Sequence, residues 1–318
     1  MALGSRRGIT LLELLAVIMI FSLMLALSVV FMQNANKDLG VSAAVHHVAG
    51  LLRLSQQHAR TTTSPAWVVL DTKENQAHAL LKETVGEWHL EDGTGFGSPA
   101  QVTGGSKVPG RVGQGVLFQG SGTIQCGDVP LFAPDQGIAV ELWFLRRPGR
   151  SRGVLARVAD QVELAAETNG QISGRVGGLR VDSGNLRLPQ DSWCYVQLIY
   201  SGRDLRLFLN RTPCGLVAGT TTWTTGAFQV GETRSGITGI VDEIRLSLIT
   251  PQDRFLLAAE CQFDFAPGFT VPPDGKVVIG FDPEGRLEPS LAPPFTFAIK
   301  STADRKALTI LLSGAVQR

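Results

Sequence analysis

Cysteine is scarce in this sequence, and the few present do not form a metal or redox motif. The 318 residues include four, Cys126, Cys194, Cys214 and Cys261, with no CxxC pair among them. This spacing argues against a zinc site and against a thioredoxin-type centre. An exported chain could pair the four as disulfides in any of three connectivities, and buried free thiols are the alternative.

Charge is sparse and nearly balanced. Charged residues make up 18% of the chain, and the net charge is +1 at pH 7. A chain without a strong field of one sign has no general attraction for nucleic acid or acidic substrates. From Arg286 onward five cations face two acids. This surplus is small, so salt-dependent DNA binding is a weak hypothesis.

Helical periodicity is almost absent after the first sixty residues. Thirty-six glycines and 16 prolines favour a body rich in strands and turns. The length exceeds one typical domain of about 100 to 200 residues, so we expect two domains.

A long apolar run begins the chain. Residues 9–32 are apolar apart from Thr10, Glu13, Ser22 and Ser28. As a helix rising ~1.5 Å per residue this run is ~36 Å long, enough to cross a ~30 Å hydrocarbon core. The arginines ahead of it, Arg6 and Arg7, favour the cytoplasmic side and predict that the rest of the chain is exported.

Glu13 is the unusual residue of this run, because a carboxylate inside a membrane helix costs roughly 2.5 to 3.5 kcal/mol unless it is neutralised. Cleavage after Gly8 would expose the amine of Ile9, which could pair with Glu13 of a neighbouring subunit. The segment Gly8-Ile9-Thr10-Leu11-Leu12-Glu13 resembles the prepilin signal of type IV pilins. The resemblance implies cleavage between Gly8 and Ile9 by a prepilin peptidase, N-methylation of Ile9, and a role for Glu13 in subunit assembly.

The same run permits two other interpretations. A secretory signal peptide cut before Val29 is less consistent, because its apolar region usually spans 7 to 15 residues without an acid. A plain single-pass anchor leaves Glu13 unexplained.

The next segment predicts a continued helix and the start of a sheet. Apolar residues recur at steps of three and four up to about Ala59, which indicates one apolar stripe that packs on a sheet; they are Val41, Ala44, Val45, Val48, Leu51 and Leu52. Residues 66–71 and 76–82 follow as strands. A long helix followed by strands is the body plan of pilins.

Residues 86–248 predict an inserted β sandwich, since short alternating strands are separated by turns. In 137–145, Ile138, Val140, Leu142 and Phe144 fall on one face. The ordered segments WHLEDGTG, GVLFQGSG, VELWF, WCYVQLIY, LRLFLN, FQVGE and VDEIRLS resemble a laminin-G-like, concanavalin-A-like jelly roll.

That resemblance implies a binding domain, because relatives of this fold include glycan binders, protein binders and glycoside hydrolases. Hydrolysis needs two carboxylates about 5 to 9.5 Å apart. The adjacent acids Glu91-Asp92 and Asp242-Glu243 would point to opposite faces of a strand. We therefore expect no enzyme. At Asp242 we expect a structural hydrogen bond rather than calcium, which needs six to eight oxygen ligands, and we expect no cofactor and no metal; calcium binding by the insert is the alternative. Trp88, Trp143 and Trp223 could stack on sugars or pack inside, with the core expected for Trp143.

The last part predicts a short helix over 251–261 and then strands over 269–271, 276–282, 295–301 and 307–318. This series resembles the C-terminal half of the pseudopilin H and FimT group.

Together these features predict an α+β fold. A leader (1–8) precedes a transmembrane and amphipathic helix (9–60), which packs on an antiparallel pilin sheet (61–85 and 249–318) carrying the jelly-roll insert (86–248). The expected function is that of a pseudopilin of a type II secretion system in the bacterial inner membrane. Its expected partners are other pilin subunits, a prepilin peptidase, membrane lipid, and a glycan or protein ligand of the insert. A minor pilin for DNA uptake and a membrane-anchored glycan-binding adhesin are the alternatives.

Overall fold

The computed structural model describes residues 11–91, 95–96, 99–129, 136–149, 152–233, 236–302 and 304–318. Between residues 11 and 39 it describes the side chains of Met19, Ser22 and Met24 alone. The described chain forms one helix, α1 (Leu11–Thr62), and twenty-two strands in three antiparallel sheets. The fold is therefore mostly β.

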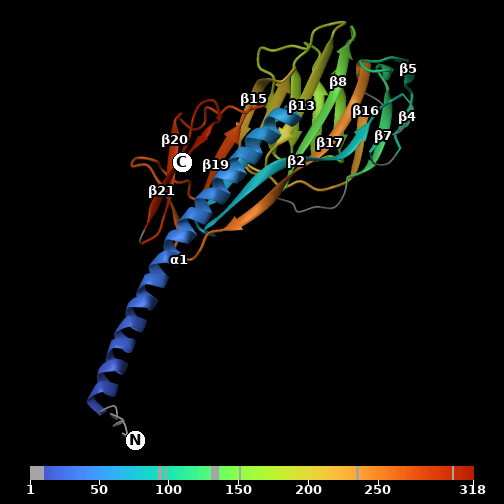
Figure 1. The fold of residues 1–318 in the computed structure, drawn as a ribbon. Coiled ribbons are helices and arrows are strands. Elements are labelled where there is room, and N and C mark those ends of the chain that lie inside the picture. Colours follow the sequence, from blue (N-terminus) through green and yellow to red (C-terminus); the bar gives the residue numbers. More distant parts are fainter. Residues whose placement is uncertain are drawn as a thin grey trace, which may run out of the picture.

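The largest sheet, sheet A, has eleven strands and runs through the whole body (Figure 1). Its β6 pairs with β17, β5 with β6, and β3 with β2. In spatial order its main path is β15 (Thr212–Ala218), β14 (Asp204–Leu209), β13 (Trp193–Tyr200), β8 (Gly137–Arg146), β17 (Thr238–Leu256), β2 (Gln76–Trp88), β1 (Ala66–Asp71) and β19 (Lys276–Phe281), and its side strands are β3 (Gly95–Phe96), β5 (Ser106–Pro109) and β6 (Gln114–Gln119).

Sheet B covers one end of sheet A and completes a sandwich. The inward residues of β8, Ile138, Val140, Leu142 and Phe144, are buried in the core between the two sheets, as their alternation predicts. The seven strands of sheet B are, in order, β12 (Leu179–Asp182), β11 (Ile172–Val176), β10 (Val162–Ala166), β9 (Gly153–Val158), β16 (Ala227–Glu232), β7 (Gly122–Asp128) and β4 (Gln101–Thr103).

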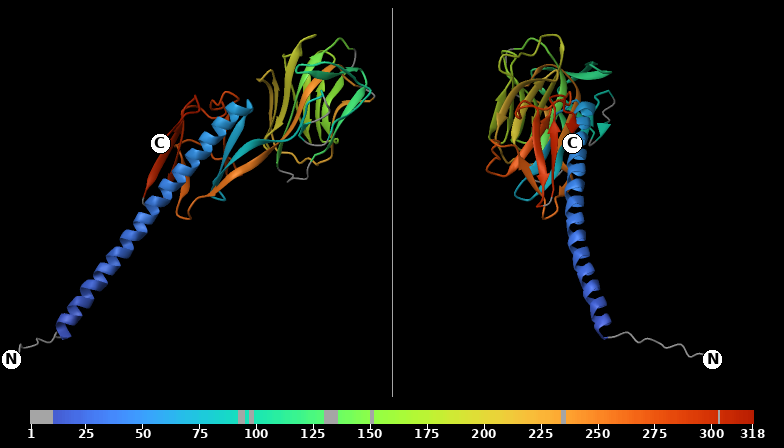
Figure 2. Two further views of the ribbon diagram at one scale, coloured as in Figure 1. Left: turned by 45° about the vertical axis from the view of Figure 1, so that its right-hand side comes forward. Right: turned by 60° about the vertical axis from the view of Figure 1, so that its left-hand side comes forward.

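The other end of sheet A packs against α1 and a small third sheet, and we call this part the base. Sheet C consists of β18 (Gln262–Phe265), β20 (Phe295–Lys300), β21 (Arg305–Ile310) and β22 (Val316–Gln317). The apolar stripe of α1 between Val41 and Leu52 is buried in the base core with β1, β2 and β19. The first half of α1 stands clear of the body (Figures 1 and 2).

Two long strands join the sandwich to the base. β17 pairs with β2 from Ile244 opposite Trp88 to Leu256 opposite Gln76. Ile244 and Trp88 are buried in the sandwich core, whereas Ala77, near the other end of β2, is buried in the base core. Backbone pairing of β2 with β17, interrupted by two shifts of register, therefore connects the two cores.

Sheet A curls so that its outer face closes on itself. Four strands separate β14 from β1, which in a flat sheet puts them about 24 Å apart at ~4.8 Å per strand. Yet Phe208 of β14 and Trp67 of β1 share one buried cluster with Ile199 and Ile249. The Arg206 guanidinium lies 5.1 Å from the centre of the Trp67 ring. The curl brings the sandwich edge over the base.

A buried ion pair lies on this same curled face. Lys82 Nζ donates to Glu141 Oε1 at 2.7 Å, and Gln197 Nε2 donates to the same oxygen at 2.8 Å. The side chain of Glu141 is fully buried. A buried charge without its partner is costly. A shift in the register of β2, β8 or β13 would separate these three side chains, so their contact favours the observed register.

Several expectations from the sequence need correction. The expected α+β fold with a transmembrane helix on a pilin sheet is wrong, because strands dominate the described residues and no helix among them is long and apolar enough to span a bilayer. Residues 251–261 are not a helix: β17 continues to Leu256 because its backbone pairs with β2. Residues 269–271 form no strand, and the later strands divide between sheets A and C.

Candidate functional site

A cleft of about 860 Å³ lies where the sandwich meets the base, and we call it the junction cleft. Its floor comes from β1, β2 and the end of β17, and it combines apolar side chains with Gln76 and His78. Its rim is polar and comes from the turn after β13, the loop after β15 and the start of β19. The lining residues are Val69, Gln76, His78, Leu80, Gln136, Tyr200, Ser201, Gly202, Arg203, Thr220, Thr221, Thr222, Ile249, Pro251, Arg254, Asp274 and Lys276.

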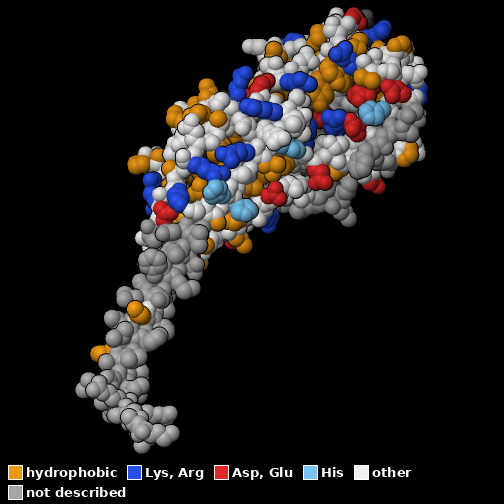
Figure 3. Space-filling view, in the orientation of Figure 1, with side chains coloured by type: hydrophobic (Ala, Val, Ile, Leu, Met, Phe, Trp, Pro, Cys, Tyr) orange, Lys and Arg blue, Asp and Glu red, His pale blue; other side chains and the backbone are white. Residues whose placement is uncertain are grey.

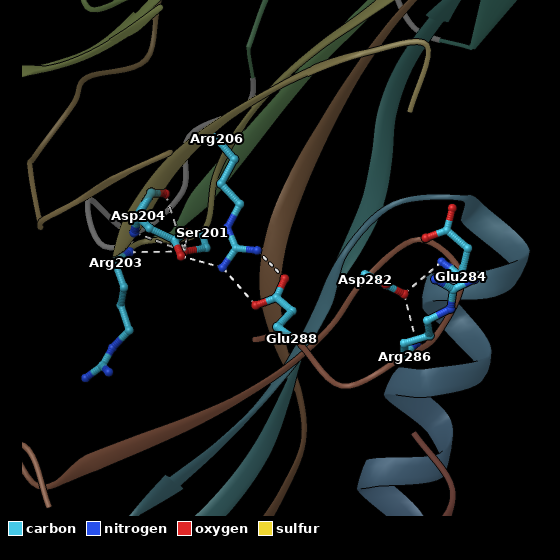
Figure 4. Close-up of polar contacts among 8 residues, drawn as sticks. All are labelled: Ser201, Arg203, Asp204, Arg206, Asp282, Glu284, Arg286 and Glu288. Atoms are coloured by element: carbon cyan, nitrogen blue, oxygen red, sulfur yellow. Dashed lines mark hydrogen bonds and ion pairs between the residues drawn. The ribbon is translucent and has the colours of Figure 1, made fainter. Parts of the chain in front are cut away.

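An ion-pair bridge beside the cleft holds the sandwich against the base. Figure 4 shows Arg206 of β14 reaching Glu288, in the segment after β19, while it also pairs with Asp204. Arg206 Nη2 donates to Glu288 Oε2 at 3.0 Å and to Asp204 Oδ2 at 2.5 Å. Gly280 makes room for this contact, because a Cβ there would lie 2.0 Å from Glu288 Oε2.

A second contact crosses the junction on the rim. Arg203 pairs with Asp274 and donates from Nη1 to the backbone oxygen of Lys276 at 3.1 Å. The hydroxyl of Ser201 donates to Asp204 Oδ1 at 2.6 Å and accepts from the backbone N–H of Arg203. The turn that carries Ser201 and Arg203 is therefore held in place without a ligand.

The loop after β15 is fixed to the sandwich by Tyr200. Its hydroxyl donates to the backbone oxygen of Thr221 and accepts from the backbone N–H of Thr221, both at 2.9 Å. These two bonds place the side chains of Thr221 and Thr222 at the rim of the cleft. The cleft walls are thus preformed.

His78 is the one histidine among the described lining residues, and it is buried. It is 9% exposed, and its Nδ1 has no hydrogen-bond partner among the described residues. Burial, together with the nearby cations Arg254, Lys276 and Arg203, lowers the pKa of His78 to about 4, although Asp71 acts in the opposite direction. The imidazole is therefore neutral at pH 7, and its Nδ1 is closed off from solvent.

The cleft offers hydrogen bonds and positive charge. Arg203, Arg254 and Lys276 line it, and Asp274 is the one carboxylate among its described lining residues. Elsewhere on the body, acidic and basic side chains are mixed on the face drawn in Figure 3. The cleft therefore differs from that face by its surplus of cations.

A second group of ionisable side chains lies at the far end of the sandwich. Glu87, His89 and Glu243 place ligand atoms within 4.8 Å of one another, as a divalent cation would require. His89 Nδ1 lies 2.9 and 3.0 Å from the two oxygens of Glu243, and this hydrogen bond raises the pKa of His89. Glu87 already pairs with Arg245. A metal there would have to displace both of these contacts.

Asp242 makes a structural contact, as the sequence predicted. Its Oδ2 accepts from the backbone N–H groups of Arg111 at 2.7 Å and Val112 at 2.9 Å, and its Oδ1 accepts from that of Glu243 at 2.9 Å. Burial raises the pKa of this carboxyl while the backbone bonds oppose the shift. Asp92, the partner acid of Glu91, lies outside the described residues.

The three tryptophans separate into core and surface. Trp88 and Trp223 are buried in the sandwich core. Trp143 is half-buried on the outer face of sheet A, with its ring centre 5.2 Å from that of Tyr195 and 4.9 Å from the guanidinium of Arg111. The expectation that Trp143 belongs to the core is wrong, because the inward positions of β8 are the even-numbered ones.

The four cysteines are free thiols, three of them buried. Burial raises the pKa of Cys194 to about 11 and that of Cys126 further still. A raised pKa keeps a thiol protonated and unreactive at pH 7. Of the two alternatives the sequence left open, the structure shows the unpaired one.

The residues predicted for processing and assembly remain untested. Gly8 and Ile9 lie outside the described residues. Glu13 lies within α1, but its side chain is outside the described part. The cleavage site and the assembly role of Glu13 therefore stay predictions.

Sequence reasoning missed the junction cleft entirely. Its lining comes from segments as far apart as Val69 and Lys276. The turn Ser201-Gly202-Arg203-Asp204 and the threonine run 220–222 could have been singled out as polar loops, but no pattern in the sequence places them opposite His78.

Comparison with known proteins found no matching protein-family model and no matching curated protein sequence. Solved structures with a similar arrangement include domain 4 of an extracellular GH43 arabinanase from Geobacillus stearothermophilus in complex with arabinotriose. That match is 16% identical with a TM-score of 0.44, and it covers 53% of this chain and 95% of the other.

In two further similar structures the match covers less than half of the other chain. The binding domain of botulinum neurotoxin serotype D is 10% identical with a TM-score of 0.41, over 51% of this chain and 47% of the other. Trypanosoma rangeli sialidase is 18% identical with a TM-score of 0.40, over 51% and 30%. At TM-scores below 0.5 these likenesses transfer neither ligand nor activity to this chain.

These results correct the predicted identity. Membership of the type IV pilin family, and with it the role of a type II secretion pseudopilin or a DNA-uptake pilin, is wrong, because strands dominate the described residues and no helix among them is long and apolar enough to span a bilayer. The single-pass inner-membrane location is wrong as well, since no described helix could span a bilayer. Pilin subunits, a prepilin peptidase and membrane lipid are no longer supported as partners.

Proposed function

We propose that this protein is a non-enzymatic binding protein that recognises carbohydrate in the junction cleft. The observation that carries the proposal is the preformed cleft itself, with a partly apolar floor and a rim of hydroxyl, amide and guanidinium groups. Its volume of about 860 Å³ lies within the range of roughly 300 to 1,000 Å³ that is usual for ligand sites.

The chemistry of the lining suits a sugar. Sugars present several hydroxyl groups around small apolar patches, and Gln76, Gln136 and Thr222 offer donors and acceptors beside the apolar side chains of the cleft. The walls are fixed by Tyr200 and by the Arg206 bridge, so little ordering cost opposes binding.

The same lining argues for binding without hydrolysis. Glycoside hydrolysis uses two carboxylates on either side of the scissile bond. Among the described lining residues Asp274 is the one carboxylate, and it is paired with Arg203. The lining therefore lacks a free acid and base pair in its described part.

Blocking the cleft tests this proposal. Thr222 lines the cleft and is exposed, so Thr222→Trp should leave the fold intact and fill the opening with an indole. We expect a glycan-array screen to identify ligands of the whole chain, and titration calorimetry to show at least about tenfold weaker binding for the variant, equal to roughly 1.4 kcal/mol.

Thr224→Trp is the matched control. Thr224 is exposed in the same loop but is not part of the cleft lining. The control should bind like the unmodified protein. A silent array, or equal binding by both tryptophan variants, would show that the cleft is not a carbohydrate site.

A further inference from the structure

The charges of the junction cleft indicate which carbohydrates it would accept. Of its three cations, Arg203 is paired with Asp274. In the described part of the chain neither Arg254 nor Lys276 forms an ion pair, and both are exposed at the cleft. Two positive charges therefore face the opening without a compensating carboxylate.

His78, a buried histidine, lies close enough to these cations to feel their charge. His78 is nine-tenths buried on the floor, and its Nδ1 has no partner among the described residues. A buried polar atom without a hydrogen bond costs free energy, about 1 to 3 kcal/mol in typical proteins. Nδ1 is closed off from solvent, so His78 responds to the charge of a ligand in the cleft without contacting it through this atom.

We propose that the junction cleft selects oligosaccharides that carry a carboxylate or sulfate group, bound between Arg254 and Lys276. The inference rests on the proposed carbohydrate-binding function and adds the charge of the ligand. Hydrogen bonds between guanidinium or ammonium groups and an anion are about twice as strong as neutral ones, so the two cations supply both affinity and selectivity.

Binding should also change the protonation of His78. The charged groups that act on it are Arg254 of β17, Lys276 of β19, Arg203 of the turn after β13, and Asp71 of β1, and the three cations lower its pKa. An anion between Arg254 and Lys276 offsets two of these cations. The pKa of His78 should then rise from about 4 toward its ordinary value, and binding below pH 6 should take up protons.

The first experiment compares three probes by titration calorimetry on the whole chain: trigalacturonate, a sulfated galactotriose and neutral galactotriose. At least one charged probe should bind about tenfold or more tightly than the neutral one, and its affinity should fall between about 50 and 500 mM NaCl. Comparison of the two charged probes separates carboxylate from sulfate.

Single substitutions test whether Arg254 and Lys276 cause the preference for charged probes. Arg254→Gln and Lys276→Gln should each weaken the charged probe by about tenfold and leave the neutral probe unchanged. Arg180→Gln is the matched control, because Arg180 is an exposed arginine of β12 on sheet B, outside the cleft lining. It should bind every probe like the unmodified chain.

The outcomes are distinct. Equal affinity for neutral and charged probes, lost in Thr222→Trp, would overturn charge selection and leave carbohydrate binding in place. No binding of any probe together with a silent glycan array would overturn both. Charge-dependent binding that Arg254→Gln and Lys276→Gln do not weaken would place the anion elsewhere and overturn the assignment.

A second readout follows His78 directly. In an NMR titration of the histidine ring, saturation with the tighter charged probe should raise the pKa of His78, whereas neutral galactotriose should not. A pKa that stays constant at saturation would contradict the position proposed for the anion.

Discussion

At the scale of single residues, His78 shows most clearly how the fold creates a site. It sits on β2 between small apolar neighbours, Ala77 and Ala79, that point into the base core. Alternation along the strand turns His78 to the opposite face, where the curl of sheet A buries it. The imidazole is therefore held neutral beside three cations.

The lowered pKa of His78 predicts a pH dependence of stability. The unfolded state takes up a proton near pH 6.5, whereas the folded state does so only near pH 4. The free energy of unfolding should therefore fall as the pH is lowered from 6.5 to 4, with this contribution fully present above pH 6.5. His78→Gln removes the group, so its stability should fall less over the same range.

Urea unfolding of both proteins at pH 7 and pH 4.5 measures the difference, because all other titrating groups are common to the two. Parallel losses of stability in both proteins would show that the pKa of His78 is not lowered in the folded chain.

The sequence correctly predicted the surroundings of single residues where the alternation of side chains along a strand alone decides which face they lie on. The even positions of β8 and the backbone-bonded Asp242 follow from alternation and from strand position. The half-buried position of Trp143 on the outer face also follows from alternation, because the even-numbered residues of β8 are the ones that face the core. His78, in contrast, depends on a curl that joins β14 to β1, which no local pattern encodes.

At the scale of elements, α1 and the β2–β17 pair organise the molecule. The stripe from Val41 to Leu52 could be predicted, since apolar steps of three and four define one helical face. The end of β17 could not be predicted. Its segment from Pro251 to Leu256 has helix-like spacing, but four residue pairs with β2 hold this segment in the sheet. Tertiary pairing overrode the local preference there.

Truncation on α1 should distinguish its two faces. Leu52 is fully buried in the base core, whereas Leu54 is 37% exposed. Leu52→Ala should lower the free energy of unfolding by about 2 to 5 kcal/mol, because it opens a cavity against β1 and β2. Leu54→Ala should change it by about 0.5 kcal/mol or less.

Urea denaturation of the two variants provides the measurement. Equal losses would mean that α1 packs on the base through a different face from the one described.

At the scale of the whole molecule, the junction cleft belongs to neither the sandwich nor the base alone. The sandwich supplies Tyr200, Arg203 and the threonine loop, and the base supplies Lys276 and Asp274. The shared ladder of β2 and β17 and the Arg206–Glu288 bridge keep the two halves at a fixed separation. A ligand in this cleft would contact both halves at once.

Hydrogen exchange of the whole chain, with and without its tightest glycan ligand, tests this claim most directly. We expect slower amide exchange in three separated segments together: 200–204 and 219–222 on the sandwich, and 274–276 on the base. Protection confined to the outer face around Trp143 and Tyr195, with those three segments unchanged at saturation, would contradict the account.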